Sequence, residues 1–137
     1  MKYLLDTDVI SQRTKTQPDP KVMAWLRTIS EDDLRLSAIT LQEIRTGAES
    51  MPAGRKRRAV EAWLEDDLLL GFADRTLAVD AAVADLCGRL IVEAINRGHR
   101  PTLGDALIAA TAKVHGLKVA TLNRKHFEWL GVGLVEF

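Results

Sequence analysis

The chain has 137 residues, and its 19 lysines and arginines are balanced by 19 aspartates and glutamates. This length predicts one domain, 1–137, with a hydrophobic core of its own. The charge balance excludes a strong overall field for a polyanion or a membrane surface, so any nucleic-acid contact must come from a local patch. The lone cysteine, Cys87, excludes an internal disulfide and indicates a packing role in a reducing compartment.

Apolar segments of strand length alternate with helical patterns along the chain. No stretch approaches the length of a membrane span, and the opening MKYLLDTDVIS lacks the long apolar core of a secretory signal, so we expect a cytoplasmic protein without a membrane partner. The expected strands are 2–5, 34–39, 73–79, 117–122 and 132–137. The expected helices are 21–29, 40–50, 60–68, 81–96, 103–115 and 124–130. This alternation predicts an α/β fold with a mostly parallel sheet and helices on both faces.

Several helix boundaries have specific signals. Thr40 and Glu43 have the spacing of a capping box, which predicts that a helix begins there. Asp80 is suited to cap the helix over 81–96, and Gly116 is suited to end the helix over 103–115. Gly47 is interpreted as a helix-end glycine.

Polar residues stand where predicted strands end or the following helices begin. Because ligands of parallel sheets bind at the carboxyl ends of the strands, these residues are expected on one rim. They are Asp6, Asp8, Glu43, Asp105 and Asn123.

Each of these residues also has a purely structural interpretation. Glu43 and Asp105 suit the first turn of a helix, Asp8 suits a turn cap, and Asn123 is ordinary after a strand. Asp6 is harder to explain in this way, because a carboxylate that directly continues a buried strand must be solvated, paired or bound to a metal.

The acids as a group indicate a metal site. Three neighbouring carboxylates raise one another's pKa unless a cation lies between them. Hard oxygen donors, without cysteines or a histidine pair, favour Mg²⁺ or Mn²⁺ over zinc, and such sites commonly process phosphates. The three histidines, His99, His115 and His126, are assigned surface or helix-end roles instead.

Basic residues near the predicted rim offer a local phosphate-binding surface on a neutral protein, although a basic run is equally typical of a solvated helix start. These candidates for RNA binding are Arg55, Lys56, Arg57, Arg58, Arg124 and Lys125.

Three segments together resemble the PIN-domain family, and within it the VapC- and FitB-like toxins of bacterial toxin–antitoxin pairs. They are LLDTDVIS, SAITLQEIRTGAE and GDALIAATAKVHGLKVATLNRKHF. The resemblance implies a three-layer α/β/α sandwich with a five-stranded sheet in the order 3-2-1-4-5, which places Asp6 and Asn123 across the reversal point from each other.

The resemblance also implies roles for individual residues. Asp6, Glu43 and Asp105 match the family's ligands for Mg²⁺ or Mn²⁺, and Asn123 matches a fourth position that is aspartate in some members. Asp8 stands where many members of the family have asparagine. Whether Asp8 adds negative charge to the site or only forms a hydrogen bond stays open. Thr7 and Ser11 match small hydroxyl residues that support the site.

The implied activity is metal-dependent cleavage of RNA by an activated water. The implied partners are RNA, a second copy of the chain in a homodimer, and a cognate antitoxin that lies across the active-site groove. Trp25 and Trp63 are candidates for lining that groove or for the core. The toxin–antitoxin assembly is expected to bind DNA through the antitoxin.

Two alternatives remain at this stage. Asp6-Thr7-Asp8 also resembles the nucleophile motif of haloacid-dehalogenase-like phosphatases, in which Asp6 would be the nucleophile. That interpretation leaves Glu43 without a role and finds Ala109 where a second later acid is expected. The other alternative is a non-catalytic binding module in which the acids are only helix caps.

Overall fold

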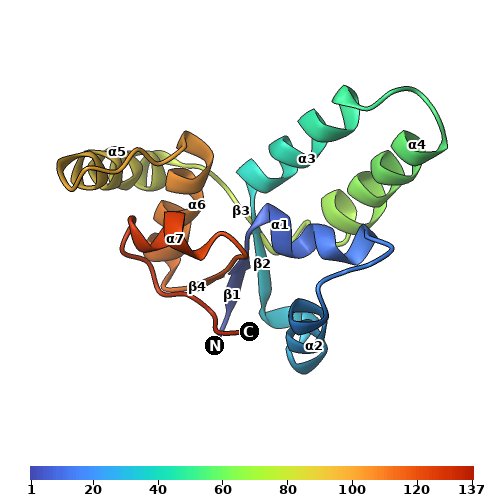
Figure 1. Cartoon of the computed structure of the whole chain (residues 1–137), viewed down its shortest axis with the longest axis horizontal. Coiled ribbons are helices and arrows are strands. Elements are labelled where there is room, and N and C mark those ends of the chain that lie inside the picture. Colours follow the sequence, from blue (N-terminus) through green and yellow to red (C-terminus); the bar gives the residue numbers. More distant parts are fainter.

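The computed structural model describes residues 1–137, and its central sheet has helices on both sides (Figure 1). Four parallel strands form the sheet in the order β3-β2-β1-β4. They are β1 (Tyr3–Leu5), β2 (Leu34–Ser37), β3 (Thr76–Leu77) and β4 (Lys118–Ala120). The helices are α1 (Thr7–Ile10), α2 (Pro20–Thr28), α3 (Ala38–Ser50), α4 (Arg55–Ala62), α5 (Ala81–Asn96), α6 (Leu103–His115) and α7 (Arg124–Glu128), with 3-10 turns η1 (Ser11–Thr14) and η2 (Glu31–Asp33) and the π-helix η3 (Trp63–Leu70).

The expected fifth strand over 132–137 is reduced to a single parallel bridge between Leu134 and Val119. The Val119 N–H donates to the Gly133 carbonyl at 2.9 Å, and the Val135 N–H donates to the Val119 carbonyl at 3.0 Å. Alternate residues of a strand direct their backbone groups to opposite sides, and β4 has only three residues. Only Val119 of β4 therefore has backbone groups free to bond with the last segment. This segment lies beside β4, as expected, without forming a strand.

The sheet is buried on both faces, as the apolar strand segments predict. Leu4 packs with α5, α6 and α7 on one face, whereas Leu5 packs with α1, α2, α3 and η3 on the other. Figure 1 shows these two groups of helices on opposite sides of β1 and β2. Consecutive side chains of a strand point to opposite faces, so this one dipeptide anchors both layers and the expected three-layer sandwich is confirmed.

Helices α5 and α6 have the expected boundaries. Asp80 caps α5 by accepting a 3.0 Å hydrogen bond from the Val83 N–H. Gly116 ends α6 in the left-handed conformation, with φ of 67°, which is favourable only for a residue without a Cβ. Cys87 is buried in α5, in agreement with its predicted packing role. None of the helices combines the length and apolar composition that crossing a membrane requires.

Helix α3 begins earlier than the capping-box spacing predicts. Its N-cap is Ser37, whose hydroxyl accepts a 3.1 Å hydrogen bond from the Ile39 N–H. Ser37 is also the last residue of β2, so the chain enters α3 without a loop and Thr40 is buried inside the helix. Gly47 lies within α3 as well and does not end it. Glu43 therefore lies beyond the first turn, where a capping role is excluded.

The helix expected over 60–68 changes character at Trp63. Helix α4 continues directly into the π-helix η3, whose C-cap is Gly71. A Cβ on Gly71 would lie 2.2 Å from the carbonyl oxygen of Asp67, so only glycine fits there without a shift of the backbone.

Candidate active site

Asp6 lies at the carboxyl end of β1 and begins α1. Its backbone N–H continues the sheet by donating to the Ala120 carbonyl at 2.9 Å. Its carboxylate Oδ1 accepts from the Thr7 N–H, and its Oδ2 accepts from the Thr121 hydroxyl, each at 2.8 Å. Only 6% of the residue is exposed. The strand end therefore holds a carboxylate in one orientation and almost out of solvent.

Burial raises the pKa of Asp6 to about 7, and the neighbouring charge of Asp8 adds to the increase. The hydrogen bonds from Thr121 and Thr7 oppose it, and the charge of Asp105 raises the pKa further. Asp6 consequently has neighbouring negative charge and little water to stabilise its ionised form. A cation at this position would favour ionisation.

Glu43 reaches the same region from α3. Its Oε1 accepts a 2.7 Å hydrogen bond from the hydroxyl of Thr7, the residue that follows Asp6. On the other side, a Cβ added to Gly104 would lie 3.0 Å from Glu43 Oε2, so α6 approaches this carboxylate closely. Thr7 and Gly104 thus confine Glu43 between α1 and the start of α6.

Asp105 stands in the first turn of α6, as predicted, and its N–H donates to the Thr102 hydroxyl at 3.2 Å. Its carboxylate also takes part in the site, because its charge raises the pKa of both Asp6 and Asp8. Asp105 Oδ2 lies 3.6 Å from Nδ1 of His126. The three acids therefore come from β1, α3 and α6, but they share one region.

Asn123 follows β4 and precedes α7 without capping it. Its side-chain Nδ2 lies 2.6 Å from His126 Nδ1, so a donating amide requires Nδ1 to be the accepting nitrogen of the imidazole. The ring of His126 stacks on Trp129 with centroids 4.7 Å apart, and His99 stacks on the same indole at 4.5 Å. His126 lies in the last turn of α7 with its side chain 41% exposed, as predicted, and it also contacts two candidate site residues.

Asp8 and Ser11 are adjacent to the acids in different ways. Asp8 does not cap a helix; its carboxylate accepts from the Leu122 N–H, at 3.3 Å to Oδ1 and 3.2 Å to Oδ2. Burial raises the pKa of Asp8, and the charge of Lys15 opposes that increase. Ser11 lines a hollow of about 330 Å³ together with Thr7 and Glu43. Asp8 and Ser11 thus lie beside the acidic centre, by which we mean Asp6, Glu43 and Asp105.

The structure separates the six basic candidates. Arg57 forms ion pairs with Glu49 and Glu61, and Arg124 forms one with Glu136. These two arginines are committed to surface networks, which the charge pattern alone did not reveal. Arg55, Arg58 and Lys125 are exposed, and Lys56 lines a second hollow.

Two contributors to the site, Thr121 and His126, were missed in the sequence. Thr121 is a hydroxyl residue directly after a strand next to the sheet's reversal point, a position that the rule for parallel sheets marks for inspection. His126 lies three residues after Asn123, which is the spacing of neighbours on a helix.

The donor set suits a hard divalent cation, because every candidate ligand is a carboxylate oxygen and Asp6 lacks a compensating charge. No three side chains of His, Cys, Asp or Glu are close enough, as they stand, to surround one ion. Ion binding would therefore require the side chains to rotate toward a common point, while the type and charge of the donors already fit.

The family model described as the PIN domain matches residues 3–129. The chain belongs to the PIN-domain family. Two curated relatives of this PIN-domain chain are a VapC ribonuclease of Sinorhizobium fredii, 38% identical over 96% of this chain and 94% of the relative, and the toxin FitB of Neisseria gonorrhoeae, 40% identical over 90% and 89%. Similarity thus extends over nearly the full length of both relatives.

Solved structures agree with the sequence relatives. FitAB bound to a DNA fragment matches with a TM-score of 0.90 and 36% identity, covering 97% of this chain and 93% of that one. FitAcB from Neisseria gonorrhoeae matches with the same TM-score and 37% identity, covering 98% and 96%. Both confirm the PIN-like fold, and both are toxin–antitoxin complexes.

Proposed function

We propose that this chain is a metal-dependent endoribonuclease and the toxin of a toxin–antitoxin pair. The observation that carries the proposal is the placement of Asp6, Glu43 and Asp105 in one region of a PIN fold, with Asp6 almost buried and its pKa raised to about 7. The names of the curated relatives, a VapC ribonuclease and a FitB toxin, support the same assignment.

Asp6, Glu43 and Asp105 are the proposed ligands of Mg²⁺, with Mn²⁺ as the alternative ion. When bound, such a cation stabilises the negative charge that develops on a phosphodiester and makes water a stronger acid. Thr121 and Thr7 orient the ligands, since one hydroxyl binds Asp6 and the other binds Glu43. Asp8 and Ser11 support the surrounding shell.

Asn123 is proposed to orient water or phosphate. Its Nδ2 is directed at His126, which leaves the carbonyl oxygen Oδ1 to accept a hydrogen bond from a reacting water. His126 then acts on the reaction through Asn123 and is a positioning residue.

The test uses protein purified free of any antitoxin, with single-stranded RNA and Mg²⁺. We expect cleavage by the wild type, and loss of cleavage with excess chelator or in Asp6→Asn. Asp67→Asn, which neutralises an exposed acid in η3, is the matched control and retains activity. Cleavage that persists in Asp6→Asn or with chelator contradicts the proposed metal site.

The phosphatase alternative is not supported, because membership in the PIN family and the Thr7–Glu43 hydrogen bond give the acids a different context. The binding-module alternative requires the acids to be only caps, whereas Glu43 lies beyond the first turn of α3. A small phosphomonoester included beside RNA in the same assay distinguishes the two hydrolytic activities.

We also propose a cognate antitoxin as partner, supported by the solved FitAB and FitAcB complexes. Its segment would occupy the groove beside the acids, where Trp63 lines the hollow with Thr7 and Glu43. Trp25 instead packs edge-on against Tyr3 and Phe137, away from that hollow. A homodimer and a larger assembly that binds DNA through the antitoxin complete the proposal, and light scattering with and without the antitoxin measures both.

A further inference from the structure

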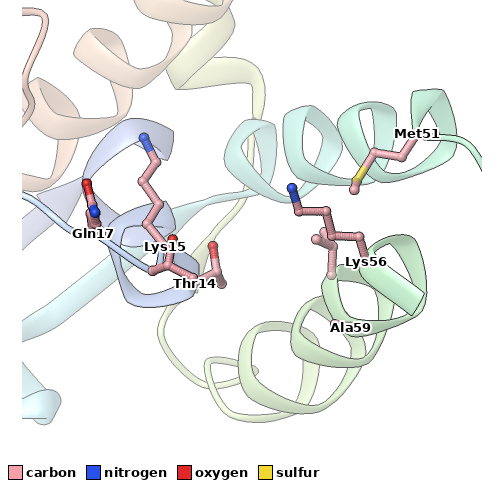
Figure 2. Close-up of a pocket in the computed structure, with 8 residues that line it drawn as sticks. Thr14, Lys15, Gln17, Met51, Lys56 and Ala59 are labelled. Carbon is pink, nitrogen blue, oxygen red and sulfur yellow. The ribbon is translucent and has the colours of Figure 1, made fainter. Parts of the chain in front are cut away.

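A hollow of about 620 Å³ lies between the segment after η1 and the start of α4. We call it the lysine groove, because Lys15 stands on one side and Lys56 on the other (Figure 2). Its lining contains no acidic residue. The lining residues are Thr14, Lys15, Thr16, Gln17, Met51, Lys56, Ala59 and Val60.

The lysine groove is continuous with the acidic centre. The smaller hollow beside Thr7 and Glu43 shares Thr14, Met51 and Val60 with it. A linear polymer bound at the acids can therefore extend along the protein surface into the lysine groove.

The two lysines are available for a ligand. Both are exposed, and neither forms an ion pair, whereas the neighbouring Arg57 is bound to Glu49 and Glu61. The positive charge of Lys15 also lowers the pKa of Asp8, which opposes the increase that burial causes.

This arrangement separates charge along one continuous surface, with acids at one end and two unpaired cations at the other. Proteins that hold single-stranded nucleic acid commonly follow its backbone with a positively charged groove. The chain as a whole is neutral, so a local pair of lysines is the kind of site that such binding requires here.

We propose that Lys15 and Lys56 bind a phosphate group of a single-stranded RNA whose neighbouring phosphodiester lies at the three acids. This inference rests on the proposed ribonuclease function and adds to it the path of the substrate. The occupant is the RNA backbone, and an acidic peptide in the same groove is the competing outcome.

The first experiment measures binding of a fluorescent single-stranded RNA in chelator, so that cleavage does not interfere. Lys15→Gln/Lys56→Gln is expected to raise Kd about tenfold and to lower the salt slope by about 0.7, the contribution of one phosphate on a single strand. Lys2→Gln/Lys118→Gln, at the amino ends of β1 and β4, is the matched control and leaves both quantities unchanged. Lys15→Arg/Lys56→Arg keeps the charges and retains affinity.

The second experiment locates the phosphate. A neutral methylphosphonate replaces one linkage of the RNA at a time, and each oligonucleotide is bound to the wild type and to Lys15→Gln/Lys56→Gln. At one linkage near the cleavage site, the replacement is expected to weaken binding to the wild type about tenfold but to leave the lysine variant unaffected. Absence of such a coupled linkage overturns the proposal.

The outcomes separate this inference from the proposed function. Lysine-dependent binding without cleavage in Mg²⁺ supports the groove and contradicts the ribonuclease. Cleavage with the same Kd and salt slope in wild type and lysine variant supports the ribonuclease and overturns the groove. If the lysine variant binds RNA as tightly as the wild type but binds polyglutamate more weakly, the groove belongs to an acidic peptide. This result also overturns the proposal.

Discussion

The hydroxyl of Thr121 donates a 2.8 Å hydrogen bond to Oδ2 of Asp6, across 115 positions of sequence. The Thr121 hydroxyl oxygen in turn accepts from the Asn123 N–H at 2.9 Å. One threonine therefore connects the end of β1 to the segment after β4 and sets the orientation of the carboxylate that the proposed metal requires.

Thr121→Val is expected to weaken Mg²⁺ binding about 10- to 100-fold, because a hydrogen bond to a charged group contributes about 1.5 to 3 kcal/mol. Without it, the pKa of Asp6 rises further. Calorimetric titration with Mg²⁺ measures the change. Thr111→Val removes another buried hydroxyl, bonded to the Leu107 carbonyl within α6, and leaves Mg²⁺ affinity unchanged. Equal Mg²⁺ affinity in both variants contradicts the assigned role of Thr121.

Asp6 makes the metal-free protein less stable as the pH rises. Its pKa is about 7 in the folded chain and 3.8 as the ordinary value, so between these pH values the folded state keeps a proton that the unfolded state has released. The destabilisation is absent below pH 3.8 and complete above 7, where it is on the order of 4 kcal/mol.

Urea unfolding in chelator at pH 5 and pH 8 measures this effect. Between these two pH values, the wild type is expected to lose about 2 to 3 kcal/mol of unfolding free energy relative to Asp6→Asn. Adding Mg²⁺ at pH 8 is expected to restore stability to the wild type alone. A wild-type-to-variant difference that does not change with pH is incompatible with the raised pKa.

Gly104→Ala is expected to displace Glu43 and to reduce kcat/KM about tenfold or more, because the added Cβ would lie 3.0 Å from Oε2. The contact involves the far end of a flexible side chain, so the protein still folds. Gly88→Ala is the control, since its Cβ has open space within α5, and it raises the melting temperature without changing kcat/KM. Full activity in Gly104→Ala means that Glu43 can move without loss of function.

His126→Ala removes the partner of the Asn123 amide and is expected to reduce kcat about tenfold with little change in KM. In the double variant with Asn123→Ala, the losses do not add, because both substitutions remove the same interaction. His115→Ala, at the exposed end of α6, leaves kcat unchanged. Additive losses in the double variant contradict a role for His126 through Asn123.

Local signals were sufficient for much of the fold. The two leucines before Asp6 predicted a strand buried on both faces, Asp80 and Gly116 marked helix boundaries, and the alternation of segments predicted a parallel sheet. Boundaries failed where several local signals compete. Ser37 caps α3 ahead of Thr40 because the chain turns directly from strand to helix.

The sequence by itself determined the layered fold and the candidate acids, because burial periodicity and helix caps depend on neighbouring residues. Only the tertiary structure decided which side chains meet across long stretches of chain. Thr121 reaches Asp6 through the pairing of β4 with β1, and Arg57 forms ion pairs with acids on two helices. Such contacts depend on the register of strands and the packing of helices, which no local pattern of residues encodes.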